Sequence, residues 1–237
     1  MILSFNIEYR TNWGEEVKLA GLSTESTPMY TTDGIYWTAE VELEVPQEGL
    51  TIHYSYQIEQ NGIVIRKEWN NFPRCLFLSG TPRKKYRIND CWKNIPEQLY
   101  LYSSAFTEAL LSHPEREDIP QGYKKGLIIK AYAPRINKDY CLAICGNQKA
   151  LGNWNPEKAV LMSDSNFPEW QVELDASKLK YPLEYKFILC HKQERKIDCW
   201  ERNPNRYLAD PEIKTNETLV ISDRYAYFDI PMWKGAG

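Results

Sequence analysis

Short segments in which apolar and polar residues alternate recur along the whole chain. The longest covers residues 52–58, where Ile52, Tyr54, Tyr56 and Ile58 occupy every second position. Alternation also occurs over residues 5–9, 17–19, 41–45, 142–144, 172–174 and 185–187. A period of two is typical of strands that bury one face, and turn residues separate these segments at intervals of about ten residues. The pattern predicts an all-β chain of the sandwich or barrel type.

One region departs from this alternation. Residues 103–111 carry apolar side chains at helical spacing behind a serine that can cap a helix. The polar stretch that follows is interrupted by Pro and Gly, as linkers are. We therefore expect a first domain over residues 1–95, a short helical linker over residues 96–123 and a second domain over residues 124–237.

The two predicted domains carry the same features in the same order, at a separation that stays between 123 and 133 residues. The matched pairs are Tyr9 with Tyr132, Gly21 with Gly146, Trp37 with Trp170, Tyr54 with Tyr185, Trp69 with Trp200, and Arg74 with Arg206. Such an order predicts a tandem duplication of a β domain of about 100 residues.

Composition excludes several partners. The formal net charge is −3, so there is no basic excess to neutralise a nucleic-acid backbone. No run of apolar residues is long enough to span a membrane, and the N-terminus has no signal-peptide pattern. We therefore expect a cytoplasmic location, reduced cysteines, and neither nucleic acid nor membrane as a partner.

Motifs for catalysis and for cofactor binding are also missing from the sequence. The six cysteines include no Cys-x-x-Cys pair, and His53, His113 and His191 lie in separate segments. No nucleophile elbow, phosphate-binding glycine loop or zinc-protease motif occurs. The expectation is a chain without catalytic residues, metal or cofactor.

Aromatic residues are more numerous than a core of this size requires, with 8 Trp, 16 Tyr and 7 Phe. Trp154 lies in a turn rich in Gly, Asn and Pro, and Trp200 ends a predicted strand just before a turn. Both positions favour exposed rings, although either ring could instead fold back onto the sandwich. Trp170 precedes an alternating strand and is expected in the core.

A longer series of residues in the second domain has the spacing of a known family. The series is Gly146, Leu151, Gly152, Trp154, Leu161, Trp170, Val172, Leu174, Glu184, Tyr185, Lys186, Phe187, Trp200, Glu201, Asn205 and Arg206. Over about residues 127–230 it resembles the starch-binding domain family, carbohydrate-binding module family 20. The resemblance implies two immunoglobulin-like β-sandwich domains in tandem and the binding of α-1,4-glucans.

The same resemblance implies roles for individual side chains. Trp154 and Trp200 correspond to the rings that stack on sugar, and Lys186, Glu201 and Asn205 to the groups that bond sugar hydroxyls. These residue types suit the chemistry. An indole covers the C–H face of a glucose ring, while polar side chains fix its hydroxyls.

The first domain departs from the family pattern. It lacks the Leu-Gly-x-Trp element, and Ser55 stands where the second domain has Lys186. The family's second glucan site corresponds to Trp13 and Tyr30 of the first domain, whereas the second domain has Lys138 at the position of Trp13. We hypothesise that each domain carries a different one of the two sites. Trp13 could alternatively be a packing residue.

The tandem arrangement and the region between the domains resemble the N-terminal part of the disproportionating 4-α-glucanotransferases (amylomaltases, glycoside hydrolase family 77). Residues 228–237 resemble the entry into the catalytic barrel of those enzymes. We expect the sequence to be part of a longer chain whose catalytic domain is its partner. The alternative is a pair of structural modules that pack on the catalytic domain or mediate oligomerisation and bind little sugar.

Overall fold

The computed structural model confirms an all-β architecture. It describes residues 1–68, 73–94, 122–133, 136, 139–192, 197–223 and 226–228. The helix expected over residues 103–111 lies outside the described residues, as does most of the expected linker.

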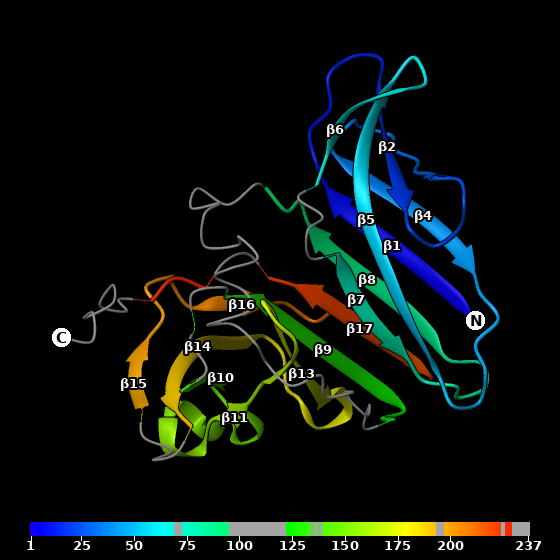
Figure 1. Cartoon of the computed structure of the whole chain (residues 1–237). Coiled ribbons are helices and arrows are strands. Elements are labelled where there is room, and N and C mark those ends of the chain that lie inside the picture. The colour runs from blue at the N-terminus through cyan, green and yellow to red at the C-terminus, as the bar shows by residue number, and fades with distance from the viewer. Residues whose placement is uncertain are drawn as a thin grey trace.

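The first half of the chain forms strands in two layers (Figure 1). The strands are β1 (Ile2–Glu8), β2 (Glu15–Ala20), β3 (Thr27–Pro28), β4 (Tyr36–Glu42), β5 (Leu50–Gln60), β6 (Ile63–Lys67), β7 (Arg74–Leu78) and β8 (Lys85–Cys91). In one layer, β1 pairs with β4 and β8. In the other, the order is β3-β2-β5-β6, with β7 also paired to β5.

The second half repeats the two-layer arrangement. Its strands are β9 (Lys125–Tyr132), β10 (Tyr140–Gly146), β11 (Val160–Leu161), β12 (Ser163–Asn166), β13 (Glu169–Asp175), β14 (Leu183–His191), β15 (Ile197–Trp200), β16 (Arg206–Leu208) and β17 (Glu217–Ser222). Short 3-10 helices accompany them in the described part of this half: η2 (Lys149–Trp154), η3 (Pro156–Lys158) and η4 (Ala176–Lys178). Strand β14 is central to the outer layer, because it pairs with β10, β15 and β16.

A single seven-stranded sheet joins the two halves, in the order β12-β13-β9-β17-β8-β1-β4 (Figure 1). At its centre β8 and β17 run parallel, in a register from Lys85 opposite Glu217 to Asn89 opposite Ile221. Backbone hydrogen bonds therefore hold the two halves together across this ladder, in addition to the covalent connection.

The two hydrophobic cores lie on opposite faces of this shared sheet. Leu219 of β17 belongs to the second-half core, whereas its neighbour Val220 is packed in the first-half core. Ile128 of β9 is likewise part of the first-half core, while Leu127 and Ile129 face the second. Because successive strand residues point to opposite faces, the first half covers the outer face of the second-half strands.

Hydrogen bonds between buried polar side chains cross the same junction. The Asp90 carboxylate on β8 accepts from the hydroxyls of Tyr54 and Tyr56 at 3.0 and 2.9 Å and from Arg74 Nη1 at 3.0 Å. It also accepts a short hydrogen bond from the Ser222 hydroxyl on β17. A side chain of the second half thus completes a polar cluster in the first.

A second buried pair lies close to this cluster. Lys130 Nζ on β9 is 2.8 Å from Glu169 on β13 and also donates to the carbonyl of Cys75 in β7. Burial alone would raise the pKa of the Glu169 carboxyl, but the charges of Lys130 and Lys93 outweigh it and hold that pKa at about 2. Glu169 is therefore a carboxylate at neutral pH.

The predictions for Trp170 and for the strand at residues 41–45 have different outcomes. Trp170 is fully buried in the second-half core, as predicted. The strand expected over residues 41–45 is instead β4, Tyr36–Glu42. Trp37 is buried opposite Ile7, and this contact fixes how β4 pairs with β1. The strand therefore begins at Tyr36, five residues before the expected start at Val41.

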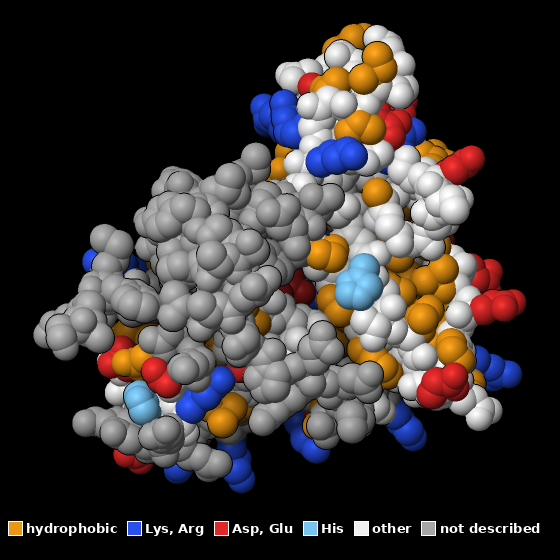
Figure 2. Space-filling model, viewed as in Figure 1, with side chains coloured by type: hydrophobic (Ala, Val, Ile, Leu, Met, Phe, Trp, Pro, Cys, Tyr) orange, Lys and Arg blue, Asp and Glu red, His pale blue; other side chains and the backbone are white. Residues whose placement is uncertain are grey.

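Apolar side chains are also exposed on β6. Ile63, Val64 and Ile65 are 68%, 38% and 46% exposed, and Figure 2 shows apolar side chains gathered at the end of the molecule where the β5–β6 hairpin projects.

Candidate functional site

The rings of Trp154 and Trp200 lie together on the outer layer of the second half. Their centroids are 6.2 Å apart and their planes are inclined by 46°. Both side chains are partly exposed. Two large rings set at an angle and open to solvent form a bent apolar surface.

The backbone at the end of η2 displays Trp154 in a rare conformation. Gly152, Asn153 and Trp154 have φ values of 82°, 51° and 59°, in the left-handed region. Gly152 is also confined, because a Cβ there would lie 2.8 Å from the Lys158 carbonyl oxygen. Below the turn, Leu151 is fully buried and anchors it to the core. A bulky residue in this conformation is a genuine outlier, and such outliers cluster at functional sites.

Trp200 is positioned by the residue that follows it. Trp200 is opposite Ile188 of β14. The Glu201 carboxylate accepts from the backbone N–H of Phe187 at 2.8 Å and from Arg206 Nε and Nη2 at 3.1 and 2.8 Å. Glu201 is only 2% exposed and both its oxygens are engaged. This geometry favours a positioning role for Glu201 over direct contact with a ligand.

Lys186 lies on the same face of the sheet as the two rings. It is two residues from Ile188 on β14 and opposite Cys145 of β10. Burial raises the pKa of the Cys145 thiol, and the nearby backbone N–H groups of Gly146 and Trp154 oppose that shift. Cys145 therefore lies between the turn that carries Trp154 and the strand position of Lys186. Lys186 is partly exposed, as a hydrogen-bond donor beside the rings would be.

Two further exposed residues accompany the pair. Asn205 is exposed in the turn that leads into β16. Tyr207, opposite Glu184 on β14, is 63% exposed and shares the face of Lys186. Tyr207 was not among the residues expected from the sequence. The sequence offers no clear signal for it, because the flanking residues Arg206 and Leu208 differ in polarity and form no alternating pattern.

The first half places its two expected aromatic residues on separate elements. Trp13 is 99% exposed in the turn between β1 and β2, where Glu15 accepts from the Asn12 backbone N–H at 2.8 Å. Tyr30 is 71% exposed and forms an isolated bridge with Thr38. Both rings are open to solvent, but they do not form a paired surface like that of Trp154 and Trp200 among the described residues.

A matching ion pair relates the two halves residue by residue. Glu68 accepts from the Tyr56 backbone N–H at 3.1 Å and from Arg74 Nη2 at 2.7 Å, as Glu201 does from Phe187 and Arg206. This match aligns Glu68 with Glu201.

The residue before Glu68 is Lys67, which is opposite Gln57 as Trp200 is opposite Ile188. Lys67 therefore corresponds in position to Trp200. The match of Trp69 with Trp200 made from the sequence is thus two residues away from the match that the strand pairing gives. Trp69 itself lies outside the described residues, as does Lys138. Among the described residues of the first half, no aromatic ring occupies the position that corresponds to Trp200.

Neither a metal cluster nor a membrane-spanning helix is present in the part of the chain that the structure describes. Within those ranges, no group of His, Cys, Asp and Glu side chains could hold a metal ion. None of the helices described there is long and apolar enough to cross a membrane.

The outer layer of the second half thus displays a tilted tryptophan pair, with Lys186 partly exposed on β14 and Asn205 exposed in the turn before β16. Residues 129–220 match the family model described as starch binding domain. This agrees with the family expected from the residue series.

One relative matches almost the entire chain. Over 261 aligned residues the chain is 24% identical to "4-alpha-glucanotransferase DPE2" of Oryza sativa subsp. japonica, with 99% of this chain and 27% of the rice protein covered. The chain thus spans 27% of the length of this relative.

Two solved structures also show similarity. The family 20 module of the maltotetraose-forming amylase from Pseudomonas saccharophila STB07 is 18% identical, with a TM-score of 0.34 over 41% of this chain and 99% of that chain. The glycoside hydrolase family 15 glucoamylase from Hypocrea jecorina is 23% identical, with a TM-score of 0.35 over 48% of this chain and 19% of that chain.

Proposed function

We propose that the second half binds α-1,4-glucans by stacking sugar rings on Trp154 and Trp200. The observation that carries the proposal is the 46° inclination of two partly exposed indoles with centroids 6.2 Å apart. Each indole presents a flat apolar face that can cover the C–H face of a glucose unit and remove both from water. An angled pair suits the curl of an α-1,4 chain better than a flat chain.

Polar side chains beside the rings would set the register of the sugar. Lys186 supplies donors, and the amide of Asn205 supplies both donors and an acceptor. Glu201 would act through Trp200, because its carboxylate is occupied by Phe187 and Arg206. Tyr207 would extend the apolar surface along the same face.

The first half would contribute differently. We propose that residues 1–95 and 124–237 are two copies of one module, supported by the matching Glu68–Arg74 and Glu201–Arg206 pairs. Trp13 and Tyr30 would then form a second, weaker contact with glucan. In this scheme the chain anchors a 4-alpha-glucanotransferase to polysaccharide and takes no part in the chemistry itself.

A structural role is the second candidate for the first half. Two observations support it. Lys67 stands at the position that corresponds to Trp200, and Val220 and Ile128 of the second half pack into the first-half core. On this alternative, the first half stabilises the second, and Trp13 and Tyr30 contact another protein surface rather than sugar.

Affinity electrophoresis in glycogen or amylopectin gels tests the proposal. Trp154→Ala and Trp200→Ala should each abolish most of the retardation, while Ile63→Ala, which removes an exposed apolar side chain at the tip of the β5–β6 hairpin, should leave it unchanged. Trp13→Ala tests the first half separately. Unchanged retardation in the Trp154→Ala/Trp200→Ala variant would reject the stacking site, and unchanged retardation in Trp13→Ala would favour the structural role.

A further inference from the structure

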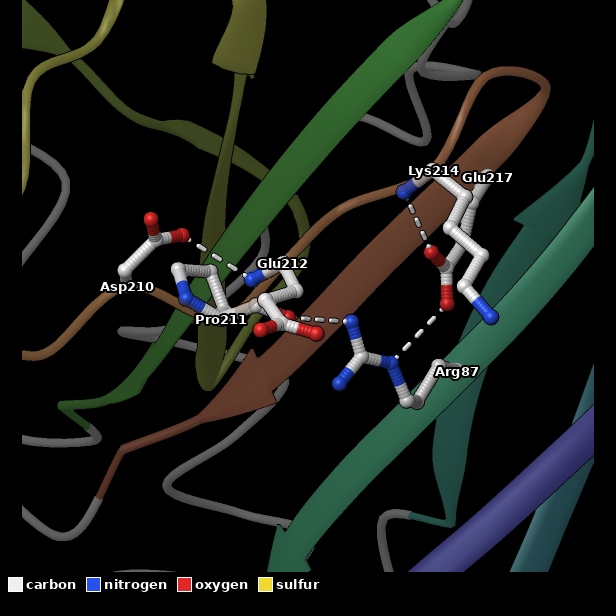
Figure 3. Close-up of a pocket in the computed structure, with 6 residues that line it drawn as sticks. All are labelled: Arg87, Asp210, Pro211, Glu212, Lys214 and Glu217. Atoms are coloured by element: carbon white, nitrogen blue, oxygen red, sulfur yellow. Dashed lines mark hydrogen bonds and ion pairs between the residues drawn. The ribbon is translucent and has the colours of Figure 1, made fainter.

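A hollow of about 460 Å³ opens where the two halves meet, away from the tryptophan pair (Figure 3). It lies between β8 and the segment that leads into β17. Its lining residues are Arg87, Asp210, Pro211, Glu212, Lys214 and Glu217. Its size lies within the usual range for small-molecule sites.

The internal repeat explains why this side of the junction is open. Asp90 accepts from Tyr54 and Arg74, and Asp223 accepts from Tyr185 at 2.6 Å and lies 3.6 Å from Arg206. Asp90 of the first half therefore corresponds to Asp223 of the second half. Three residues before each aspartate, Arg87 corresponds to Val220. Val220 is fully buried in the first-half core, whereas the Arg87 side chain is 32% exposed. The surface of the second half around Val220 is therefore apolar and is covered by the first half. The corresponding surface of the first half around Arg87 is polar and open to solvent.

The side chains that line the hollow are held in place. Arg87 Nε donates to Glu217 at 2.9 Å, and Arg87 Nη2 donates to the Pro211 carbonyl at 2.7 Å. The other Glu217 oxygen accepts from the Lys214 backbone N–H at 2.7 Å. These bonds tie both halves to one rigid rim, as the dashed lines in Figure 3 show.

Glu212 is held in an unfavourable backbone conformation beside this rim. Its φ is +47°, and its backbone N–H donates to Asp210 at 3.0 Å. Such strain persists only where the surroundings impose it. Neither the Glu212 carboxylate nor the Lys214 ammonium has a hydrogen-bond or ion-pair partner among the described residues, and both side chains are exposed. An acceptor and a donor therefore remain available at the hollow.

A third polar group lies nearby. The Tyr181 hydroxyl is buried without a hydrogen-bond partner in the described part of the chain, and it is close enough to Asp210 for that charge to add to burial in raising the pKa of Tyr181.

The charges at the hollow restrict the class of ligand. Two cationic and three anionic side chains leave no positive excess to attract an anion, and the described residues offer no metal-binding cluster. A hydroxyl group both donates and accepts, so it can satisfy a carboxylate and an ammonium at once. No aromatic side chain lines the hollow, so a ligand would be held without stacking.

We propose that this hollow binds a short neutral sugar, of mono- or disaccharide size, through hydrogen bonds to Glu212, Lys214 and Arg87. The site is separate from the tryptophan pair and does not depend on stacking. It would recognise the polar rim of a sugar, whereas Trp154 and Trp200 would recognise its apolar face. Affinity should be weak, in the millimolar range.

Amide chemical shifts during a maltose titration of the full chain test the proposal. The amides of Arg87, Glu212, Lys214 and Glu217 should shift and saturate at millimolar maltose. The Glu212→Ala/Lys214→Ala variant should raise the half-saturating concentration at Arg87 and Glu217 at least tenfold. Both substituted residues are exposed, and an unchanged thermal midpoint confirms that the variant is folded.

Two control variants and a titration with glycerol make the result decisive. The Glu48→Ala variant, which removes an exposed carboxylate elsewhere, should titrate like the unmodified chain. The Trp154→Ala/Trp200→Ala variant should keep the shifts at the hollow even where it loses starch retention, which separates this site from the proposed stacking site. Absence of saturating shifts, shifts that survive the Glu212→Ala/Lys214→Ala change, shifts lost with the tryptophans, or equal shifts with glycerol would each overturn the proposal.

Discussion

Glu201 and Arg206 form an ion pair with two hydrogen bonds directly behind Trp200, at 3.1 and 2.8 Å. The Glu201 side chain is completely shielded from solvent and that of Arg206 is 12% exposed. Glu201 also accepts from the Phe187 backbone N–H. The pair therefore fixes the end of β15, and with it the position of the Trp200 ring.

Removing the cation of this pair should destabilise the fold. Arg206→Ala leaves the buried Glu201 carboxylate without its partner, which typically costs about 3–5 kcal/mol. Urea denaturation should show this loss, together with reduced retardation in glycogen gels. Lys178→Ala removes the partner of Asp175 in a pair whose lysine is 75% exposed, and it should cost less than about 1 kcal/mol. Equal losses in the two variants would contradict the positioning role.

The turn that displays Trp154 should not tolerate a Cβ at Gly152. An alanine there would adopt an unfavourable φ and also approach the Lys158 carbonyl to 2.8 Å. Gly62 is the matched control, because its φ is +76° and no atom lies within 4 Å of the Cβ that an alanine would add there. Both substitutions should cost about 1–2 kcal/mol from backbone strain. Only Gly152→Ala should also weaken glucan retention, since only that turn must move.

Glu169 should make the stability of the fold dependent on pH. Its folded-state pKa of about 2 lies below the ordinary value of 4.5, so the carboxylate stabilises the fold above the unfolded pKa. This contribution, about 3 kcal/mol at neutral pH, should be lost as the pH falls from about 5 toward 2. Urea midpoints measured across that range should decline. In Glu169→Gln the decline should be smaller, whereas Glu44→Gln, an exposed site, should decline like the unmodified chain.

The two halves should unfold together, because the first-half core contains side chains of the second. Ile128→Ala removes a buried side chain of β9 from the first-half core and should cost about 2–5 kcal/mol. Tryptophan fluorescence and far-ultraviolet circular dichroism should show coincident transitions in both proteins. Two separate transitions, with only one shifted by Ile128→Ala, would show that the halves are independent units.

The fold class and the exposure of the Trp154 ring were within reach of the sequence, because each depends on local pattern, whereas the pairing of Trp154 with Trp200 was implied only by the family resemblance. Alternation marks strands with one buried face, and a ring in a turn of Gly, Asn and Pro has little core to enter. The β4 boundary was misplaced because Trp37 opposite Ile7 sets the register, and that contact spans 30 residues.

Features that depend on long-range contacts could not be predicted. Nothing local in Val220 or Ile128 indicates that they pack into the other half. Glu201 was expected at the sugar from the family resemblance alone, and no local pattern indicates that the backbone of Phe187 and the side chain of Arg206 enclose it. The hollow beside Arg87 depends on the pairing of β8 with β17, which joins residues more than a hundred positions apart.

The parallel ladder between β8 and β17 has a consequence for the proposed binding of long glucan chains. A flexible tether would allow two attachment points to adapt to any ligand, but a hydrogen-bonded sheet fixes their separation. If both halves bind glucan as proposed, oligomers too short to reach both aromatic surfaces would occupy only one at a time, and the gain from double attachment should begin at a threshold chain length rather than grow gradually.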